Sequence, residues 1–432
     1  MRVPWAVAGV AAAAITSGSC LLGGPPAPVI RIGVDLPLSG AEARSATPAL
    51  NGIRYYVQQH PSLEGFTVEL DVKDDTTGGV PDSGKGAEDI RSFVADSSVL
   101  AVMGPFDSSV ARDEIPVANR ALLAMVSPVT SSPCLTQEVY LPAALSPSHT
   151  AVTCKDAGLF PASALRPSGV NNYFRLAPTD QLQGPAAADY LFNSLQVLRA
   201  GVISDHETYG QALADSFTAR FTRLGGSVLG RLDLDSSADP TAFLRRVKAQ
   251  GVQAIYYGGI TANSGCVVRA QMADVFGPGA VIPFAGGDGI AEDPACLRDA
   301  GSGYAGIYAT VPAVDPTSVA SANQVVSGFK AAFPNRSDYG AYTVVAYDAA
   351  AVVYRGIDRA IRGWQGQLPP RGTVTTEIAG TSNFAGATGV LGFDVNGDTT
   401  HRVISVEQSP RHDPAAPWSF TATVDYTAAL PY

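Results

Sequence analysis

Short apolar runs and amphipathic segments alternate along the first third of the chain. The apolar runs have the length and the β-branched content of buried strands, whereas the segments between them carry apolar residues at helical spacing. This alternation is typical of a parallel sheet with helices on both faces. The expected strands are 29–40, 66–75, 98–104 and 123–128, and the expected helices are 50–60, 84–96 and 108–123.

The same alternation restarts over 173–312, so the chain contains a second α/β set. Two helical segments follow at 317–334 and 341–362, and the Asn-Gly pair at 396–397 predicts a turn that closes a terminal hairpin. The Pro/Ser-rich segment 129–172 fits neither set and is long for a loop, which is usual for a functional or inserted segment. Two α/β sets joined by extended segments predict two similar lobes.

The N-terminus has the pattern of an export signal. Arg2 precedes an apolar run that is too short to span a bilayer, and small residues then lead to Cys20. Cys20 resembles the lipidated cysteine of bacterial lipoproteins, although Ser17 stands where that signal usually has Leu. We therefore expect a signal peptide over 1–19, a linker over 20–28, and a mature protein that is secreted, periplasmic or anchored to the membrane by lipid.

Composition narrows the choice of partners. Of the 432 residues, 46% are hydrophobic and only 16% are charged, which is enough for a large core. The net charge of −10 disfavours nucleic acids, which require a basic face, and also anionic membrane surfaces. Composition therefore disfavours both of these classes of partner.

The five cysteines agree with export. If Cys20 is reserved for lipid, an even number remains for an oxidising compartment. The simplest pairing joins Cys134 to Cys154 and Cys266 to Cys296, with other pairings open. A zinc site is disfavoured because no CxxC occurs and no His lies near these cysteines at ligand spacing.

Motifs for catalysis are weak. The segment GVPDSGKG at 79–86 approaches a phosphate-binding loop, but Gly86 stands where a Ser or Thr must hold magnesium. No GxSxG, HExxH or GxGxxG pattern occurs, and the five His residues are scattered. We expect no catalytic residue, no metal and no cofactor, and together with export this favours binding over catalysis.

The chain resembles the leucine/isoleucine/valine-binding proteins, the substrate-binding components of branched-chain amino-acid ABC transporters. The resemblance runs from about 29 to 408 and rests on the order of IRIGVDLPLSG, VMGPFDSS, MVSPVTSSPCLT, FRLAPTDQLQGPAAADYL, DHETYGQALADSF, IYYGG, FAGGDG and GVLGFDVNGD. It implies an α/β, two-lobed type I periplasmic-binding fold, each lobe a mostly parallel sheet flanked by helices, with three hinge crossovers. Lobe 1 would comprise 29–178 and 314–385, and lobe 2 would comprise 179–313 and 386–432.

The resemblance also implies a ligand site at the carboxyl ends of the lobe 1 strands. Ser108 follows one strand and opens a helix, where free N–H groups favour a carboxylate. In the family, residues matching Ser108 and Ser131, with backbone around Thr130, hold the carboxylate and amine of the ligand. Asp107 and Val129 lie beside them in the sequence. A helix cap is the ordinary alternative for Ser108.

Other predicted site residues complete the pocket. Asp288 matches the acidic residue that pairs with the ligand ammonium, and Tyr209 matches an aromatic residue of the second lobe. A turn aspartate and a core tyrosine are the respective alternatives. Phe106 matches an aliphatic pocket residue. Ile260 and Thr261 stand where well-known members carry Tyr, so the pocket could prefer a different amino acid, or an amide-like or carboxylated solute.

The resemblance implies an exported protein that captures a branched-chain amino acid or a related small solute and delivers it to an ABC permease. A solute sensor of the same fold that signals to a membrane receptor is the alternative. A secreted α/β enzyme is a remote third reading, because it would require a convergent nucleophile and base.

Overall fold

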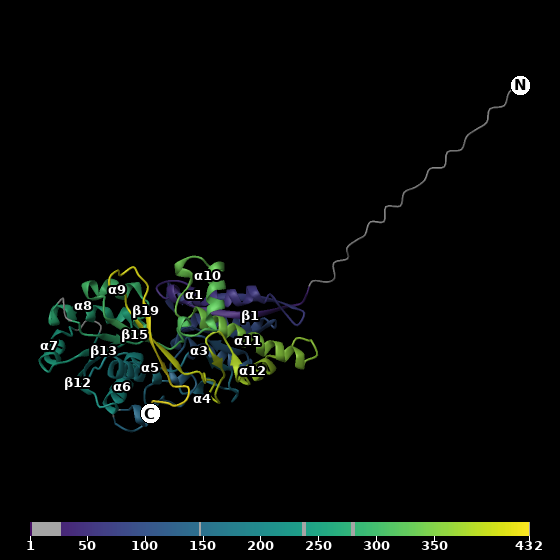
Figure 1. Ribbon diagram of the computed structural model, residues 1–432. Coiled ribbons are helices and arrows are strands. Elements are labelled where there is room, and N and C mark those ends of the chain that lie inside the picture. The colour runs from purple at the N-terminus through teal and green to yellow at the C-terminus, as the bar shows by residue number, and fades with distance from the viewer. Residues whose placement is uncertain (2–26, 147, 236–238, 278–280, 432) are drawn as a thin grey trace.

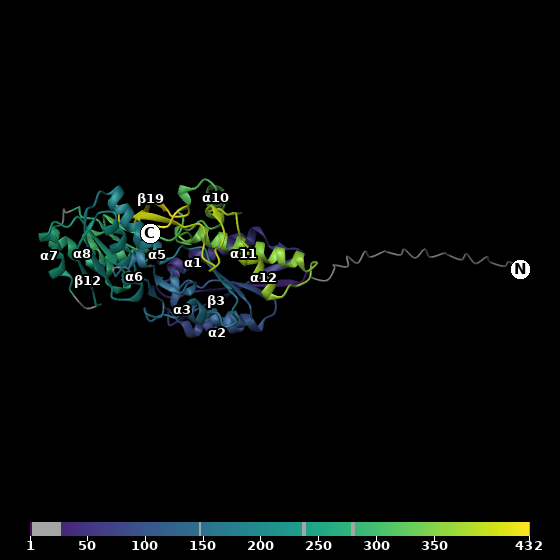
Figure 2. The ribbon, with the colours of Figure 1, turned by 90° about the horizontal axis from the view of Figure 1, so that it is seen from below.

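The computed structural model describes Met1 and residues 27–146, 148–235, 239–277 and 281–431. Apart from Met1, the expected signal peptide lies outside the described residues, as does Cys20. The described chain forms two lobes that lie side by side, each built on its own sheet (Figure 1). The view from below separates the same two halves (Figure 2). The α/β, two-lobed fold expected from the sequence is confirmed.

Lobe 1 is built on a six-stranded sheet in the order β10-β7-β6-β1-β3-β2. All neighbouring strands are parallel except β2 and β3. The central strand β1 is buried along nearly its whole length, because helices cover both faces. The strands are β1 (Val29–Leu36), β2 (Ser62–Leu63), β3 (Phe66–Asp74), β6 (Val99–Met103), β7 (Ala124–Ser127) and β10 (Tyr173–Arg175).

The helices of lobe 1 come from both ends of the chain. The apolar side chains of α11 share one buried cluster with those of β1 and α1, so distant segments form one core. Helix α1 begins before the expected 50–60, because packing in this core outweighs the interruption by Pro48. The helices are α1 (Ala43–Gln59), α2 (Ser83–Ala95), α3 (Ser108–Arg120), α10 (Ala322–Ala332), α11 (Thr343–Gly363) and α12 (Arg371–Ala379).

Lobe 2 is built on a seven-stranded sheet in the order β12-β11-β13-β14-β15-β18-β19. The first five strands are parallel, and β18 and β19 extend the sheet in antiparallel fashion. The strands are β11 (Arg199–Ser204), β12 (Ser227–Asp233), β13 (Ala254–Gly258), β14 (Phe284–Gly286), β15 (Ile307–Val311), β18 (Val403–Gln408) and β19 (Ser419–Asp425). The helices are α5 (Asp180–Asp189), α6 (Thr208–Arg223), α7 (Thr241–Ala249), α8 (Gly265–Phe276) and α9 (Pro294–Asp299).

Within the described residues the chain passes between the two sheets after β10, after β15 and before β18. The expected terminal hairpin around 396–397 is wrong in its pairing. The turn forms, with a bridge between Phe393 and Thr399, but β18 pairs with β15 and β19. Strand β17 (Val390–Leu391) instead pairs with β16 (Phe384–Ala385), and Leu391 packs in the lobe 1 core.

The segment 133–172 leaves the lobe 1 sheet and packs on helices of lobe 2. The segment contains a hairpin of β8 (Val139–Leu141) and β9 (Val152–Thr153). The side-chain Nε2 of Gln181 in α5 donates hydrogen bonds to the carbonyl groups of Val139 and Tyr140 in this hairpin, each at 3.0 Å. The Tyr140 hydroxyl donates to the Thr208 carbonyl at the start of α6. This segment therefore adds a contact between the lobes beside the three crossovers.

Both expected disulfides are present. Cys134 is bonded to Cys154 and closes the inserted segment, and Cys266 is bonded to Cys296 inside lobe 2. Small two-stranded pieces and one short helix complete the fold: β4 (Thr76–Thr77), β5 (Val80–Pro81) and α4 (Ala162–Leu165).

Replacing Cys134 and Cys154 together by Ser should lower the free energy of unfolding. The bond closes a loop with a sequence separation of 20, and a cross-link of this length stabilises by about 3 kcal/mol through the entropy of the unfolded chain. Urea unfolding under oxidising conditions measures the change. An unchanged midpoint would show that the bond contributes nothing to stability.

Candidate ligand-binding site

The carboxylate of Asp288 lies at the centre of the contact between the lobes. It follows β14 in a single 3₁₀ turn, at the carboxyl end of the lobe 2 sheet. Its Oδ1 accepts hydrogen bonds from Gln183 Nε2 and from the Tyr209 hydroxyl, both at 2.8 Å. Its Oδ2 accepts from the Tyr342 hydroxyl at 2.7 Å. All three donors are neutral groups, so they satisfy the carboxyl oxygens of Asp288 without adding a positive charge beside them.

Tyr342 belongs to lobe 1 and precedes α11, so its hydrogen bond with Asp288 crosses from one lobe to the other. Its ring meets the ring of Phe106 edge to face, with 5.6 Å between centroids. Burial and the charge of Asp288 raise the pKa of Tyr209 and of Tyr342 above their ordinary value. Both phenols therefore stay protonated and act as donors.

Ser108 opens α3 directly after the loop that follows β6. Its Oγ accepts a hydrogen bond from the Ser132 N–H at 3.3 Å, which ties the helix start to the loop after β7. The preceding Asp107 does not cap the helix with its side chain. Burial, together with the nearby Glu42, raises the pKa of the Asp107 carboxyl well above its usual range.

Ser131 contacts the first residue of α5. Its carbonyl accepts from the Asp180 N–H at 3.0 Å, and its hydroxyl bonds to the carboxyl of the same residue. Burial raises the pKa of Asp180 to about 7, and the charge of Asp288 acts in the same direction. The start of α5 thus places a second carboxyl group beside Asp288.

Val129 and Thr130 have structural roles in this conformation. Val129 packs in the lobe 1 core, and the Thr130 hydroxyl donates to Ser127 Oγ at 3.0 Å and bonds to the Tyr173 hydroxyl. Their backbone N–H groups both donate to Ser127 Oγ, at 3.2 and 3.0 Å. The structure therefore brings Ser131 to the contact between the lobes but turns these two residues toward the core.

Ile260 and Thr261 border the turn that carries Asp288. The Thr261 hydroxyl donates to the Gly289 carbonyl at 3.3 Å. Ile260 is 37% exposed, and its N–H donates to Asp205 Oδ2 at 3.3 Å. Of the predicted residues, Tyr209 contacts Asp288 directly, Thr261 contacts the residue after it, and Phe106 reaches it through Tyr342. Ser131 reaches Asp288 only through Asp180 and Gln183, and Ser108 contacts the residue after Ser131.

A buried ion pair fixes the loop that carries Ser131. The Nε of Arg175, fully buried at the end of β10, donates to Asp398 Oδ1 at 2.7 Å. Its other nitrogens donate to the Ser132 carbonyl and to Thr136 Oγ1, both at 2.6 Å. Burial opposes ionisation of Asp398, but the charge of Arg175 and the hydrogen bonds from Gln137, Thr136 and Arg175 together outweigh it and lower the pKa of that carboxyl.

Four residues at or beside this contact were not predicted from the sequence: Tyr342, Asp180, Gln183 and Arg175. Three of them carry a positional signal, because Arg175 ends a strand and Asp180 and Gln183 open the next helix, at the edge where α/β sheets bind ligands. Tyr342 carries no comparable signal, since it lies far from the other site residues in the chain and reaches them through the contact between lobes.

A sequence model described as periplasmic binding protein matches residues 29–408. The chain belongs to the periplasmic binding protein family. It is therefore a solute-binding protein and not an enzyme, and its family works outside the cytoplasm. Among the described helices, none combines the length and the hydrophobicity needed to cross a bilayer.

Two curated relatives show the range of similarity. An amino acid binding protein of Pseudomonas aeruginosa is 30% identical over 190 residues, which are 44% of this chain and only half (50%) of that protein. The Leu/Ile/Val-binding protein BraC3 of Rhizobium johnstonii is 25% identical over 383 residues, which are 87% of this chain and 90% of that protein.

Solved structures share the fold at lower identity. The leucine-binding protein LivK of Thermotoga maritima superposes with a TM-score of 0.70 at 23% identity, covering 91% of this chain and 98% of that chain. A solute-binding protein of Rhodopseudomonas palustris HaA2 in complex with p-hydroxybenzoic acid gives a TM-score of 0.70 at 16% identity, covering 94% and 98%. These structures establish the two-lobed architecture.

Substituting Asp180 by Asn should change how stability depends on pH. With a pKa of about 7 in the fold and about 4 when unfolded, Asp180 holds a proton in the native state that the unfolded chain releases. Its contribution to the free energy of unfolding therefore falls by up to about 1.4 kcal/mol per pH unit between pH 4 and 7, and is constant above.

Relative to the wild type, the Asp180→Asn variant should gain stability as the pH rises from 5 to 8. Urea unfolding at both pH values measures this difference. If the variant and the wild type differ by the same amount at pH 5 and pH 8, Asp180 does not titrate in this window.

Proposed function

We propose that this protein captures an amino acid in the cleft between its lobes and delivers it to an ABC permease. In this proposal the ligand ammonium lies against Asp288, and the ligand carboxylate lies at the start of α3, near Ser108 and Ser131. The observation that carries the proposal is the Asp288 carboxyl, which accepts hydrogen bonds from neutral donors of both lobes.

Electrostatics favours a ligand with a positive group. Asp288 accepts its three hydrogen bonds from neutral donors, whereas burial raises the pKa of Asp107 and of Asp180 and so favours their uncharged forms. Arg175, the buried cation of the Ser131 loop, is paired with Asp398. A purely anionic solute would therefore meet the Asp288 carboxyl without a compensating cation, whereas an amino acid brings its own ammonium group.

The start of α3 supports a site for the ligand carboxylate. The first N–H groups of a helix have no partner within the helix and favour an anion, and a Ser hydroxyl adds one more donor. Helix α3 is 13 residues long and follows the carboxyl end of β6, which is the sheet edge where such folds bind ligands.

Transport rather than signalling is the role that the relatives favour. BraC3 is named a Leu/Ile/Val-binding protein, and a neighbour in Streptococcus pneumoniae is the substrate-binding protein of a branched-chain amino acid transporter, solved with isoleucine. In this proposal the chain is exported by residues 1–19, held at the membrane through lipid on Cys20, and opens and closes as a monomer.

The proposal is tested by measuring the binding of the twenty amino acids and of benzoates, with thermal shift as a screen and calorimetry for the affinity. We expect at least one amino acid to raise the melting temperature, and benzoate to have no effect. The Asp288→Asn variant should lose about 30-fold or more in affinity, because it removes the charge that faces the ammonium.

Asp293→Asn is the matched control, because Asp293 lies five positions along the same segment and caps α9, a role that Asn fills equally well. Unchanged affinity in Asp288→Asn, or a response to benzoate alone, would refute the proposed orientation of an amino acid in the cleft.

A further inference from the structure

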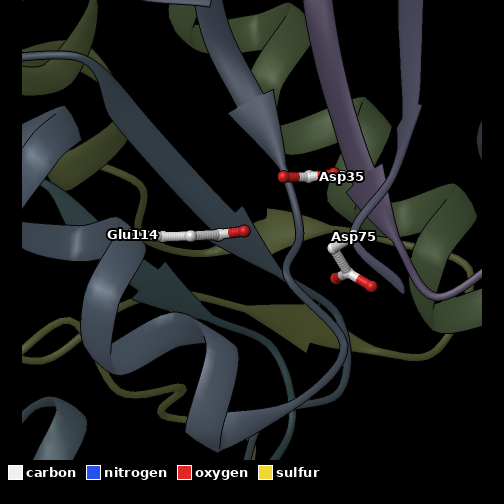
Figure 3. A group of neighbouring side chains, drawn as sticks. All are labelled: Asp35, Asp75 and Glu114. Atoms are coloured by element: carbon white, nitrogen blue, oxygen red, sulfur yellow. The ribbon is translucent and has the colours of Figure 1, made fainter. Parts of the chain in front are cut away.

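A second group of carboxyl side chains lies inside lobe 1. Asp35 is near the end of β1, Asp75 directly follows β3, and Glu114 is in the middle of α3. All three residues have 0% exposure, and one oxygen from each lies within 4.8 Å of the other two. Figure 3 shows Glu114 reaching from its helix toward the strand ends that carry Asp35 and Asp75.

The carboxylate oxygens of this cluster lack hydrogen-bond donors. Both oxygens of Asp35, of Asp75 and of Glu114 have no donor among the described residues. Elsewhere the fold satisfies a buried carboxylate: Asp348 accepts from the backbone of Ala387 and from the backbone and hydroxyl of Thr388. Buried carboxyl groups without donors are strongly unfavourable unless a proton or a cation compensates them.

The surrounding charges do not supply that compensation. Lys85 is the nearby cation, and its Nζ is paired with Asp89 on the same helix. Asp107 at the start of α3, and Glu42 and Asp74 near the strand ends, are further acidic groups and supply no positive charge. Consequently the three acids form the interior of a larger acidic region.

Without a cation, the cluster must hold protons. Burial raises the pKa of Asp35 to about 8 and of Asp75 to about 7, and raises that of Glu114 well above its usual range. A proton between Asp35 and Glu114 would satisfy that pair, but it would leave the two oxygens of Asp75 without a donor.

Packing from α2 preserves the space for the Glu114 carboxylate. A Cβ atom at Gly86 would lie 2.5 Å from Glu114 Oε1 and 2.6 Å from Val110 Cγ1. Gly86 is the residue that departs from the phosphate-binding pattern at 79–86. Its lack of a side chain is therefore explained by the carboxyl cluster, and the neighbouring Lys85 is used in an ion pair rather than for phosphate.

We propose that Asp35, Asp75 and Glu114 form a binding site for a divalent cation, Ca²⁺. Carboxylate oxygens are the ligands that hard cations prefer, and the three groups together offer six oxygens. Ca²⁺ takes about six to eight oxygen ligands, waters included, in flexible geometry, whereas Mg²⁺ keeps several of its waters and suits a wholly buried carboxylate cluster less well. A bound ion would join β1 and β3 to α3, the helix that presents Ser108.

Equilibrium dialysis with ⁴⁵Ca²⁺ tests the site on protein treated with EGTA at pH 8. The wild type should bind one ion per chain, and Ca²⁺ should raise its melting temperature by about 2 °C or more. The Glu114→Gln variant should lose both responses. Without Ca²⁺ it should melt no lower than the wild type, since the amide removes a buried acid and supplies a donor.

Glu407→Gln is the matched control. Glu407 is also buried, has one oxygen without a partner and lies beside another carboxyl, that of Glu292, but it belongs to lobe 2. This variant should keep the Ca²⁺ response, and Asp35→Asn replaces Glu114→Gln if the latter fails to fold.

Three results would overturn the site. Absence of bound Ca²⁺ in the wild type would mean that the cluster is held by protons alone. Binding that persists in both Glu114→Gln and Asp35→Asn would place the ion elsewhere. A larger thermal shift with Mg²⁺ than with Ca²⁺ would contradict the assignment of the cation.

Discussion

The two lobes depend on one shared carboxylate, that of Asp288. Lobe 2 supplies Gln183 and Tyr209 as donors, and lobe 1 supplies Tyr342. Neutral donors satisfy the oxygens of a carboxylate without supplying a positive charge of their own. A site of this kind selects for a ligand that carries a cation of its own. In the proposed function, the same contact would couple closing of the lobes to recognition of the ligand ammonium group, because Tyr342 reaches Asp288 only when the lobes meet.

Several fixed elements hold the groups around that carboxylate. Arg175, buried and paired with Asp398, anchors the loop of Ser131 to a segment that crosses between the lobes. The disulfide-closed insert adds contacts from the lobe 1 loop to α5 and α6. The lobes are thus joined by three crossovers and by one cross-linked insert that lies on the outside of α6. Any change in the angle between the lobes must also accommodate the contacts of the insert with α5 and α6. The insert therefore restricts hinge motion in addition to the three crossovers.

The sequence predicted the parts of the fold that local pattern decides. Apolar runs located the strands of both sheets. The resemblance carried by short motifs predicts Ser108, Tyr209 and Asp288 as ligand-binding residues, and the structure brings Tyr209 and Asp288 into direct contact. Which strands pair with each other was harder to predict from the sequence. The turn predicted at 396–397 forms, but the strands on its two sides belong to different sheets, since β18 pairs with β15 and β17 pairs with β16. Tyr342 and the cluster of Asp35, Asp75 and Glu114 could not be found, because their proximity depends on lobe contact and on the register of β1, β3 and α3.

The most direct measurement is a crystal structure of the protein with the amino acid that stabilises it most. We expect the ligand ammonium to lie within hydrogen-bond distance of Asp288, and the ligand carboxylate to meet the start of α3 at Ser108. A ligand bound in the reverse orientation, or at a place away from Asp288, would contradict the central role of this carboxylate in joining the lobes and selecting the solute.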